Sequence, residues 1–261
     1  MWQSVREHST LAAVLLGLII LICIPAKGPA RGEGVSQEGL VGYWRLNDGT
    51  GAIAKDSLGQ GRDSEIRNAE WVTGGFGTAL HFNGENACVV VPEISELNGT
   101  DEFTVEAWVF WEGTGRYPNI LTGGAWNPGG FMIFVCDGQC SFRMGKPGPA
   151  PWQIGKDWDE TSATLVRSIQ LGRWYHLAAT FKRPTLTTSV DGELAGSASW
   201  NYPVGQSGKI SIGTWNDAGL GPGMFHYGMI AEVKIFNRAL STSEIEADYR
   251  KGHDLRKGVQ P

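Results

Sequence analysis

The chain has 261 residues, with 22 Lys and Arg against 27 Asp and Glu, so its formal charge is −5. This acidic balance argues against a nucleic-acid binder that depends on phosphate contacts. Hydrophobic residues make up 41% and charged residues 19%, which supports a large core and argues against intrinsic disorder. The 37 glycines and 11 tryptophans indicate many turns and half-buried pleated surfaces, and therefore a β-rich protein.

The chain opens with a polar segment at residues 1–8 and an apolar run at 11–24, followed by small residues such as Ala26 and Ala30. This order is typical of an export signal. The run is shorter than the about 18–20 residues that span a bilayer. We therefore expect residues 1–30 to be a signal peptide, and the mature chain to be secreted or to lie at the cell surface or in the periplasm. An uncleaved anchor is the alternative, and it alone would bring membrane contact.

From Leu40 onward, short alternating or apolar runs are separated by Gly, Asn and Asp, which is typical of β-strands. The run at 103–111 is apolar on both faces, as in an inner strand covered on each side. Asp191-Gly192 is the strongest hairpin signal. Long helices do not alternate with these runs, which excludes a parallel α/β sheet. The expected strands are 40–46, 79–82, 88–91, 103–111, 131–135, 141–144, 174–181, 185–190, 209–212 and 229–236.

Three cysteines follow the export signal, namely Cys88, Cys136 and Cys140. An odd number in an exported chain leaves at least one thiol unpaired. Cys136 and Cys140 bracket a turn signal between two strand-like runs. We therefore expect a disulfide between Cys136 and Cys140 across the mouth of a hairpin, with Cys88 unpaired. The sequence has no Cys/His cluster at zinc spacing.

One helix is expected near the C-terminus, where its start is strongly marked. Ser241 and Glu244 form a capping box, and Leu240 can pack on Ile245 as a hydrophobic staple. Gly252 offers a C-cap. We expect this helix to pack across one sheet edge.

About a dozen antiparallel strands without an internal repeat fit a jelly roll better than a propeller. We therefore expect an all-β protein, a two-sheet antiparallel jelly roll β-sandwich with a short C-terminal helix. The expected boundaries are a linker at 31–38, the domain at 39–252 and a tail at 253–261. The strand signal lapses between Gly145 and Arg173, and a loop of this length is usually functional or disordered.

Seven strings in order over about 210 residues resemble one known family. They are GYWRL at 42–46, DSLGQG at 56–61, LHFNG at 80–84, FTVEAWV at 103–109, WYHLAATF at 174–181, VDGE at 190–193 and IAEVKIFNRALS at 230–241. They are similar to the LamG-like jelly roll domains of the concanavalin A-like lectin/glucanase superfamily. The resemblance implies the fold but no single function, since this architecture serves lectins, adhesion modules, glycoside hydrolases and noncatalytic domains.

Hydrolases resembling this fold carry an E-x-D-x-x-E string on one strand, which this chain lacks. Retaining hydrolysis needs two carboxyls about 5–5.5 Å apart. We interpret Glu106 as a structural acid, His176 as a structural histidine, Glu232 as a surface charge beside Lys234, and Asp248 as part of the solvated side of the helix. We therefore expect no enzyme, with a glycoside hydrolase or lyase that uses an unrecognised acid pair as the alternative.

The resemblance also implies a calcium site in some family members, because calcium takes oxygen ligands from carboxylates and turn carbonyls. Three places correspond: the turn at Asp56, the carbonyl of Gly84 and an Asp that opens the last long strand. In this chain Ala231 replaces that Asp, and the neighbouring Glu232 points to the opposite face. We therefore expect no cofactor, with a calcium site on Asp56, Gly84 and Glu232 as the alternative.

Sugar recognition needs aromatic rings that stack on pyranose faces, with amides and carboxylates for the hydroxyls. Candidates in or beside turns are Trp126, Trp152, Trp158, Asp159, Trp215 and Asn216, and core packing is the alternative for each ring. We predict an exported noncatalytic module that binds a glycan or an extracellular protein partner and no nucleic acid. A purely structural module is a further alternative.

Overall fold

The computed structural model of the chain describes residues 37–74, 76–113, 117–124, 129–136, 138–145, 162–205, 207–215 and 224–256. These ranges contain sixteen β-strands, a 3₁₀ turn (η1, Ser95–Leu97) and an α-helix (α1, Thr242–Arg256). The predicted all-β class with a short C-terminal helix is therefore confirmed. The predicted signal peptide at 1–30 and most of the predicted linker lie outside the described residues. Within the described ranges, no helix is long and apolar enough to cross a membrane.

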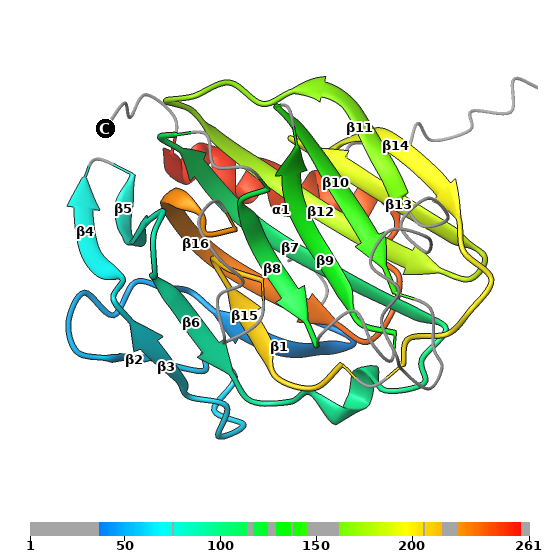
Figure 1. Cartoon of the computed structure of the whole chain (residues 1–261), viewed down its shortest axis with the longest axis horizontal. Coiled ribbons are helices and arrows are strands. Elements are labelled where there is room, and N and C mark those ends of the chain that lie inside the picture. Colours follow the sequence, from blue (N-terminus) through cyan, green and yellow to red (C-terminus); the bar gives the residue numbers. More distant parts are fainter. Residues whose placement is uncertain are drawn as a thin grey trace, which may run out of the picture. The chain divides into compact units, whose positions relative to one another are not determined.

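Eight strands form the first sheet, sheet A. They are β1 (Leu40–Trp44), β4 (Glu70–Gly74), β5 (Gly77–Asn83), β7 (Glu102–Trp111), β12 (Trp174–Lys182), β13 (Thr185–Val190), β14 (Glu193–Ser199) and β16 (Tyr227–Phe236). Their order is β14-β13-β12-β7-β16-β5-β4, and β1 also pairs with β16 (Figure 1). All these pairs are antiparallel.

Eight further strands form sheet B. They are β2 (Ile53–Ala54), β3 (Ser64–Arg67), β6 (Cys88–Val91), β8 (Asn119–Gly123), β9 (Phe131–Cys136), β10 (Gln139–Met144), β11 (Ser162–Ser168) and β15 (Ile210–Ile212). Their order is β11-β10-β9-β8-β15-β6-β3-β2, again with antiparallel pairs. The two sheets make the predicted β-sandwich.

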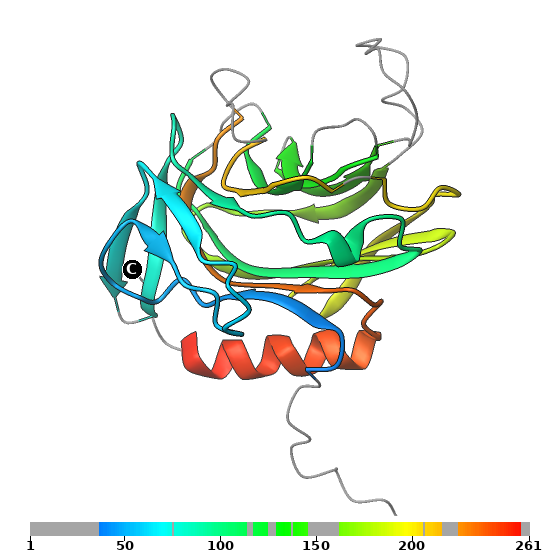
Figure 2. The ribbon, with the colours of Figure 1, turned by 90° about the horizontal axis from the view of Figure 1, so that it is seen from below.

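The hydrophobic core lies between the facing sheets (Figure 2). Alternate residues of each strand point inward. Phe103 and Val105 of β7 are two residues apart, and both side chains therefore lie in the core. The ring centroid of Phe103 lies 4.6 Å from that of Phe131 in sheet B and 6.0 Å from that of Phe181 in sheet A. Aromatic contacts of this kind join the two layers.

Strand β7 is buried on both faces, as its sequence predicts. Its outward side chains Glu106, Trp108 and Phe110 are at most 3% exposed. Helix α1 lies along the outer face of sheet A (Figure 2), where Ile245 packs in one cluster with Ala178 of β12. The predicted packing of the helix at a sheet edge is therefore wrong, because its apolar residues cover a sheet face.

The start of α1 has the predicted cap. The Ser241 N–H donates to Oε2 of Glu244 over 2.8 Å, and the Glu244 N–H donates to Oγ of Ser241 over 3.3 Å. Leu240 and Ile245 belong to the same buried cluster. The capping box and the hydrophobic staple are thus both confirmed.

Gly252 is not the C-cap, because α1 continues to Arg256. The predicted domain end at residue 252 therefore cuts the helix. A Cβ atom built on Gly252 would lie 2.3 Å from Nε1 of Trp108 on β7. Glycine at this position lets the helix approach the sheet closely.

All ten expected strands are present, and the Asp191-Gly192 turn joins β13 to β14 with both residues at positive φ. Five further strands, β2, β3, β4, β8 and β11, were not expected from the sequence. Strand β11 lies within the stretch between Gly145 and Arg173 that we expected to be a loop, and it pairs with β10. That expectation is therefore wrong for residues 162–168.

The predicted disulfide between Cys136 and Cys140 is wrong. Cys140 is a free thiol, fully buried in the core. Its partner across the β9–β10 hairpin is Val135, whereas Cys136 lies opposite Gln139. Successive residues of a strand point to opposite faces, so the residue that shares a face with Cys140 is Val135.

Candidate binding pocket

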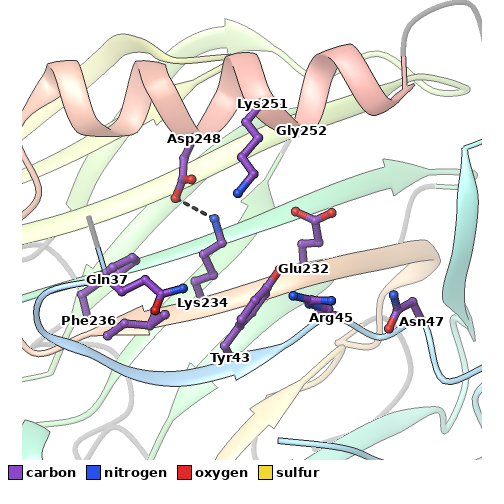
Figure 3. Close-up of a pocket in the computed structure, with 11 residues that line it drawn as sticks. Gln37, Tyr43, Arg45, Asn47, Glu232, Lys234, Phe236, Asp248, Lys251 and Gly252 are labelled. Atoms are coloured by element: carbon purple, nitrogen blue, oxygen red, sulfur yellow. Dashed lines mark hydrogen bonds and ion pairs between the residues drawn. The ribbon is translucent and has the colours of Figure 1, made fainter. Parts of the chain in front are cut away.

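A hollow of about 330 Å³ lies where β1, β16 and α1 meet (Figure 3). We call it the β1–α1 pocket. Most of its lining side chains are charged or carry an amide or a hydroxyl. The lining residues are Gln37, Leu40, Tyr43, Arg45, Asn47, Glu232, Lys234, Phe236, Asp248, Lys251 and Gly252.

A bulge in β16 shapes this pocket. Ala231 lies opposite Trp108 of β7, but the next paired residue, opposite Glu106, is Lys234, so β16 carries one extra residue. Glu232 in the bulge has a φ of 50°, a left-handed conformation that costs a non-glycine residue about 1–2 kcal/mol. Its N–H donates to the carbonyl of Arg45. Because of the bulge, the side chains of Glu232 and Lys234 do not follow the regular alternation of a strand. Our interpretation of Glu232 as a surface charge beside Lys234 had assumed that alternation.

An ion pair joins the helix to the sheet at the inner end of the pocket. Nζ of Lys234 lies 2.7 Å from Oδ2 of Asp248, and the two side chains are 15% and 1% exposed (Figure 3). Burial lowers the pKa of Lys234, but the charge of Asp248 and the bond to it outweigh this effect, and the pKa is raised. Lys234 is therefore a cation at neutral pH.

Glu106 lies beneath this ion pair and is 1% exposed. Burial, followed by a hydrogen bond to Asp248 and the charge of Asp248, raises the pKa of Glu106 well above its usual range. No donor group of the described residues reaches either oxygen of Glu106 or Oδ1 of Asp248. A proton on Glu106, donated to Asp248, supplies the missing donor. Nε2 of His176 lies further away, 3.9 Å from Oε1 of Glu106.

Tyr43 lies between the charged groups of the pocket. The guanidinium carbon of Arg45 is 5.5 Å from the centroid of the Tyr43 ring, and Nζ of Lys234 is 5.7 Å from it, as in cation–π contacts. Burial and then the charge of Glu232 raise the pKa of Tyr43. The phenol is therefore neutral at physiological pH and keeps its O–H as a donor.

The arrangement offers donors and acceptors within one small volume. Arg45, Lys234 and Lys251 donate, Glu232 and Asp248 accept, and Asn47 does both. Such a lining suits a polar ligand with several hydroxyl groups, each of which donates and accepts. A purely apolar ligand would leave these groups unpaired.

A family model for the concanavalin A-like lectin/glucanases superfamily matches residues 83–246, which is more than half of the chain. The chain belongs to this superfamily. The resemblance found in the sequence strings is therefore confirmed. A search of the curated proteins found no match to this chain.

The solved structures similar to this superfamily member include the following three. Domain 4 of AbnA, a GH43 extracellular arabinanase from Geobacillus stearothermophilus in complex with arabinotriose, is 20% identical with a TM-score of 0.61, over 80% of this chain and 97% of that chain. The binding domain of Paraclostridial Mosquitocidal Protein 1 is 17% identical with a TM-score of 0.62, over 82% and 52%. Trypanosoma rangeli sialidase in complex with sialic acid is 22% identical with a TM-score of 0.62, over 86% and 35%. The chain thus spans about half and about a third of the last two, and these likenesses show the fold alone.

Most of the ligand-binding residues expected from the sequence lie outside the described residues, namely Trp126, Trp152, Trp158, Asp159 and Asn216. Trp215 is described and is 7% exposed. It packs in a cluster with Met132 and Phe134 of sheet B. The expectation of an open Trp215 ring is therefore wrong, because this ring is covered by core-type packing.

The structure describes the positions at which the superfamily resemblance implies calcium ligands. The carboxylate of Asp56 accepts hydrogen bonds from the N–H groups of Leu58, Gln60 and Arg62 within its own turn. The N–H of Gly84 donates to the carbonyl of His226. Among the described residues, no group of three or more His, Cys, Asp or Glu is placed to hold a metal ion.

Sequence reasoning missed the β1–α1 pocket, although it named one lining residue, Glu232, as a candidate calcium ligand. Asp248 is 3% exposed, so its assignment to the solvated side of the helix is wrong. Two signals were present: Tyr43 and Arg45 are two apart on an alternating run, and Asp248 and Lys251 are three apart on a helix, where such residues are neighbours. Neither signal shows that the run and the helix meet across β16.

Proposed function

We propose that this chain is an exported, noncatalytic binding module that recognises carbohydrate through the β1–α1 pocket. The observation that carries the proposal is the polar lining of this pocket, with donors and acceptors interspersed around about 330 Å³. Ligand pockets usually measure about 300–1,000 Å³, so this one suits one or two sugar units. It is too small and recessed to serve as a protein docking face of about 800 Å².

The relatives support the same class of function. The AbnA domain was solved in complex with arabinotriose. Its similarity to this chain extends over 97% of the domain. Its parent protein is named as an extracellular arabinanase. We extend glycan binding to this chain because its own pocket carries suitable groups, since the fold by itself serves many functions.

The rival function is glycoside hydrolysis by an acid pair that the sequence does not reveal. In the structure, Glu106 and Asp248 are two neighbouring acids that could be considered for this role. Both carboxyls lie under α1, at 1% and 3% exposure. Hydrolysis requires the glycosidic bond to lie between the acid and its partner carboxylate. A glycan in the β1–α1 pocket would meet Asp248 from one side, with Glu106 behind it, so this pair favours a structural role.

Export is the second part of the proposal, and it is supported by the apolar run at 11–24 and the small residues after it. Intact mass of the secreted chain tests it, with a mature amino terminus expected at Lys27 or Arg31. A secreted or membrane-bound product that retains residues 1–26 would contradict cleavage.

Binding is tested with the full chain on a glycan array, followed by calorimetry on the best oligosaccharides. Arg45→Ala should weaken binding about tenfold or more, the scale of a lost charged hydrogen bond. The matched control is Arg250→Ala, since Arg250 is an exposed arginine of α1 that does not line the pocket. No binding to any glycan, or equal binding by Arg45→Ala and the wild type, would overturn the proposal.

A reducing-sugar assay on the same oligosaccharides separates binding from hydrolysis. The wild-type chain should release no new reducing ends over hours at high protein concentration. Release that Glu106→Gln abolishes would overturn the noncatalytic assignment and identify the buried pair as the catalytic acids.

A further inference from the structure

We infer that the sugar bound in the β1–α1 pocket carries a carboxylate, as uronic acids do. The inference rests on the proposed function and names its ligand class. It starts from the charges of the pocket, where Arg45, Lys234 and Lys251 outnumber Glu232 and Asp248. The chain as a whole carries a formal charge of −5, so a pocket with an excess of cations differs from the rest of the molecule.

Two of these charges cancel each other at contact. Lys234 and Asp248 lie 2.7 Å apart, and the carboxylate side chain is 1% exposed. A closed pair of this kind exerts little net attraction on a ligand of either sign. The choice of ligand charge is therefore left to Arg45 and Lys251, opposed by Glu232.

The acid beneath the pocket adds no second negative charge. Glu106 is fully covered, and burial together with Asp248 raises its pKa well above the usual range. The raised pKa favours the neutral, protonated form of this carboxyl. Without this proton the inner end of the pocket would be anionic, and it would repel a carboxylate.

Lys251 is the cation with room for a ligand. It is exposed on α1, and its amine has no hydrogen-bond or ion-pair partner among the described residues. Figure 3 shows its side chain directed from the helix toward Lys234 and the pocket. An exposed, unpaired ammonium beside an enclosed polar volume attracts an anion more than a neutral hydroxyl.

Arg45 faces the pocket from the opposite side, after the end of β1 (Figure 3). Its guanidinium lies over the ring of Tyr43, with the guanidinium carbon 5.5 Å from the ring centroid. A planar guanidinium matches the geometry of a carboxylate and binds it with two parallel hydrogen bonds. Arg45 and Lys251 together can therefore hold one carboxylate from two sides.

Glu232 provides the sharpest test, because it is a half-buried acid of the pocket and opposes an anionic ligand. Replacing it by Gln keeps the size and hydrogen-bonding capacity of the side chain and removes the repulsion. Glu232→Gln should therefore strengthen binding of an acidic sugar by about twofold to fivefold, the scale of one partly screened charge. It should leave binding of a neutral sugar equal or weaker.

The experiment measures binding of the full chain to short oligomers of glucuronic, galacturonic and mannuronic acid, each paired with its methyl ester. The ester keeps the sugar and removes the charge. We expect at least one acid to bind about tenfold or more tightly than its ester. Lys251→Ala should reduce this preference about twofold to fivefold, and Lys182→Ala, which changes an exposed lysine outside the pocket, should not.

The outcomes separate this inference from the proposed function. Neutral glycans that bind as tightly as every acid, with Lys251→Ala and Glu232→Gln unchanged, would overturn the inference and leave carbohydrate binding intact. A chain that binds no glycan at all would overturn both. Acid preference that survives Lys251→Ala and Arg45→Ala would move the anion site elsewhere and also overturn the inference.

Discussion

The carboxyl groups of Glu106 on β7 and Asp248 on α1 meet beneath the helix, and Asp248 also contacts Lys234. Donor groups of the described residues do not reach the oxygens of Glu106. The protonated carboxyl of Glu106 is therefore its own donor, toward Asp248. This shared proton is part of the attachment of α1 to sheet A, and it makes that attachment dependent on pH.

Glu106→Gln should make the stability of the protein less sensitive to alkaline pH. The pKa of folded Glu106 is raised well above the ordinary value of 4.5. Its stabilising contribution is therefore complete below about pH 4.5 and is lost as the pH rises toward the folded pKa. Glutamine keeps an N–H donor for Asp248 and does not ionise. The difference in Tm between Glu106→Gln and the wild type should thus shift in favour of the variant as the pH rises.

The measurement is Tm from about pH 5 to pH 9, with Glu85→Gln as the control. Glu85 is an exposed glutamate outside this cluster, so its variant should follow the wild-type curve. If Glu106→Gln also runs parallel to the wild type over this range, Glu106 is not the group that titrates.

Gly252→Ala should destabilise the protein, although alanine usually stabilises a helix interior by about 1 kcal/mol relative to glycine. The added methyl would lie 2.3 Å from Nε1 of the buried Trp108 ring. Overpacking of this kind costs about 1–3 kcal/mol. Urea denaturation measures the change, and Lys251→Ala on the exposed side of α1 should change stability by less than about 0.5 kcal/mol. A more stable Gly252→Ala would contradict the close approach of α1 to Trp108.

Cys140 should be unreactive until the protein unfolds. Burial raises the pKa of its thiol to about 12, so almost no thiolate exists at pH 8. Mass-resolved alkylation without reductant should leave Cys140 unmodified in the folded chain and fully modified in guanidinium. A Cys140 that resists alkylation in both states would be in a disulfide.

Calcium should have little effect on stability. The oxygens of Asp56 already accept hydrogen bonds from three backbone N–H groups, and Ala231 of β16 supplies no carboxylate. Millimolar calcium or EDTA should therefore shift Tm by less than about 1 °C. A calcium-dependent rise of many degrees would reveal a site that binds the folded state.

The fold could be predicted where short-range pattern decides it. The apolar residues on both faces of strand β7 predict its burial on both sides. The Ser241–Glu244 capping box predicts the start of α1. Strand β8 gives no such signal, because Asn119 and Gly123 are poor strand formers. Its buried position comes from pairing with β9 and β15.

The pocket could not be predicted, because it depends on long-range contacts. Lys234 meets Asp248 only after β16 and α1 have packed, and the bulge at Glu232 changes which residues of β16 share a face. A polar residue on a helix is solvated in most cases. Asp248 is an exception because Lys234 and Glu106 lie below it.

The most direct test of the central claim is to locate the bound sugar. We propose an amide chemical-shift titration of the ¹⁵N-labelled chain with the oligosaccharide that binds best. We expect the largest changes at four residues that line the β1–α1 pocket, Tyr43, Asn47, Lys234 and Lys251. Changes confined to residues 145–173, with none at these four positions, would contradict this expectation and favour the Trp152 and Trp158 site expected from the sequence.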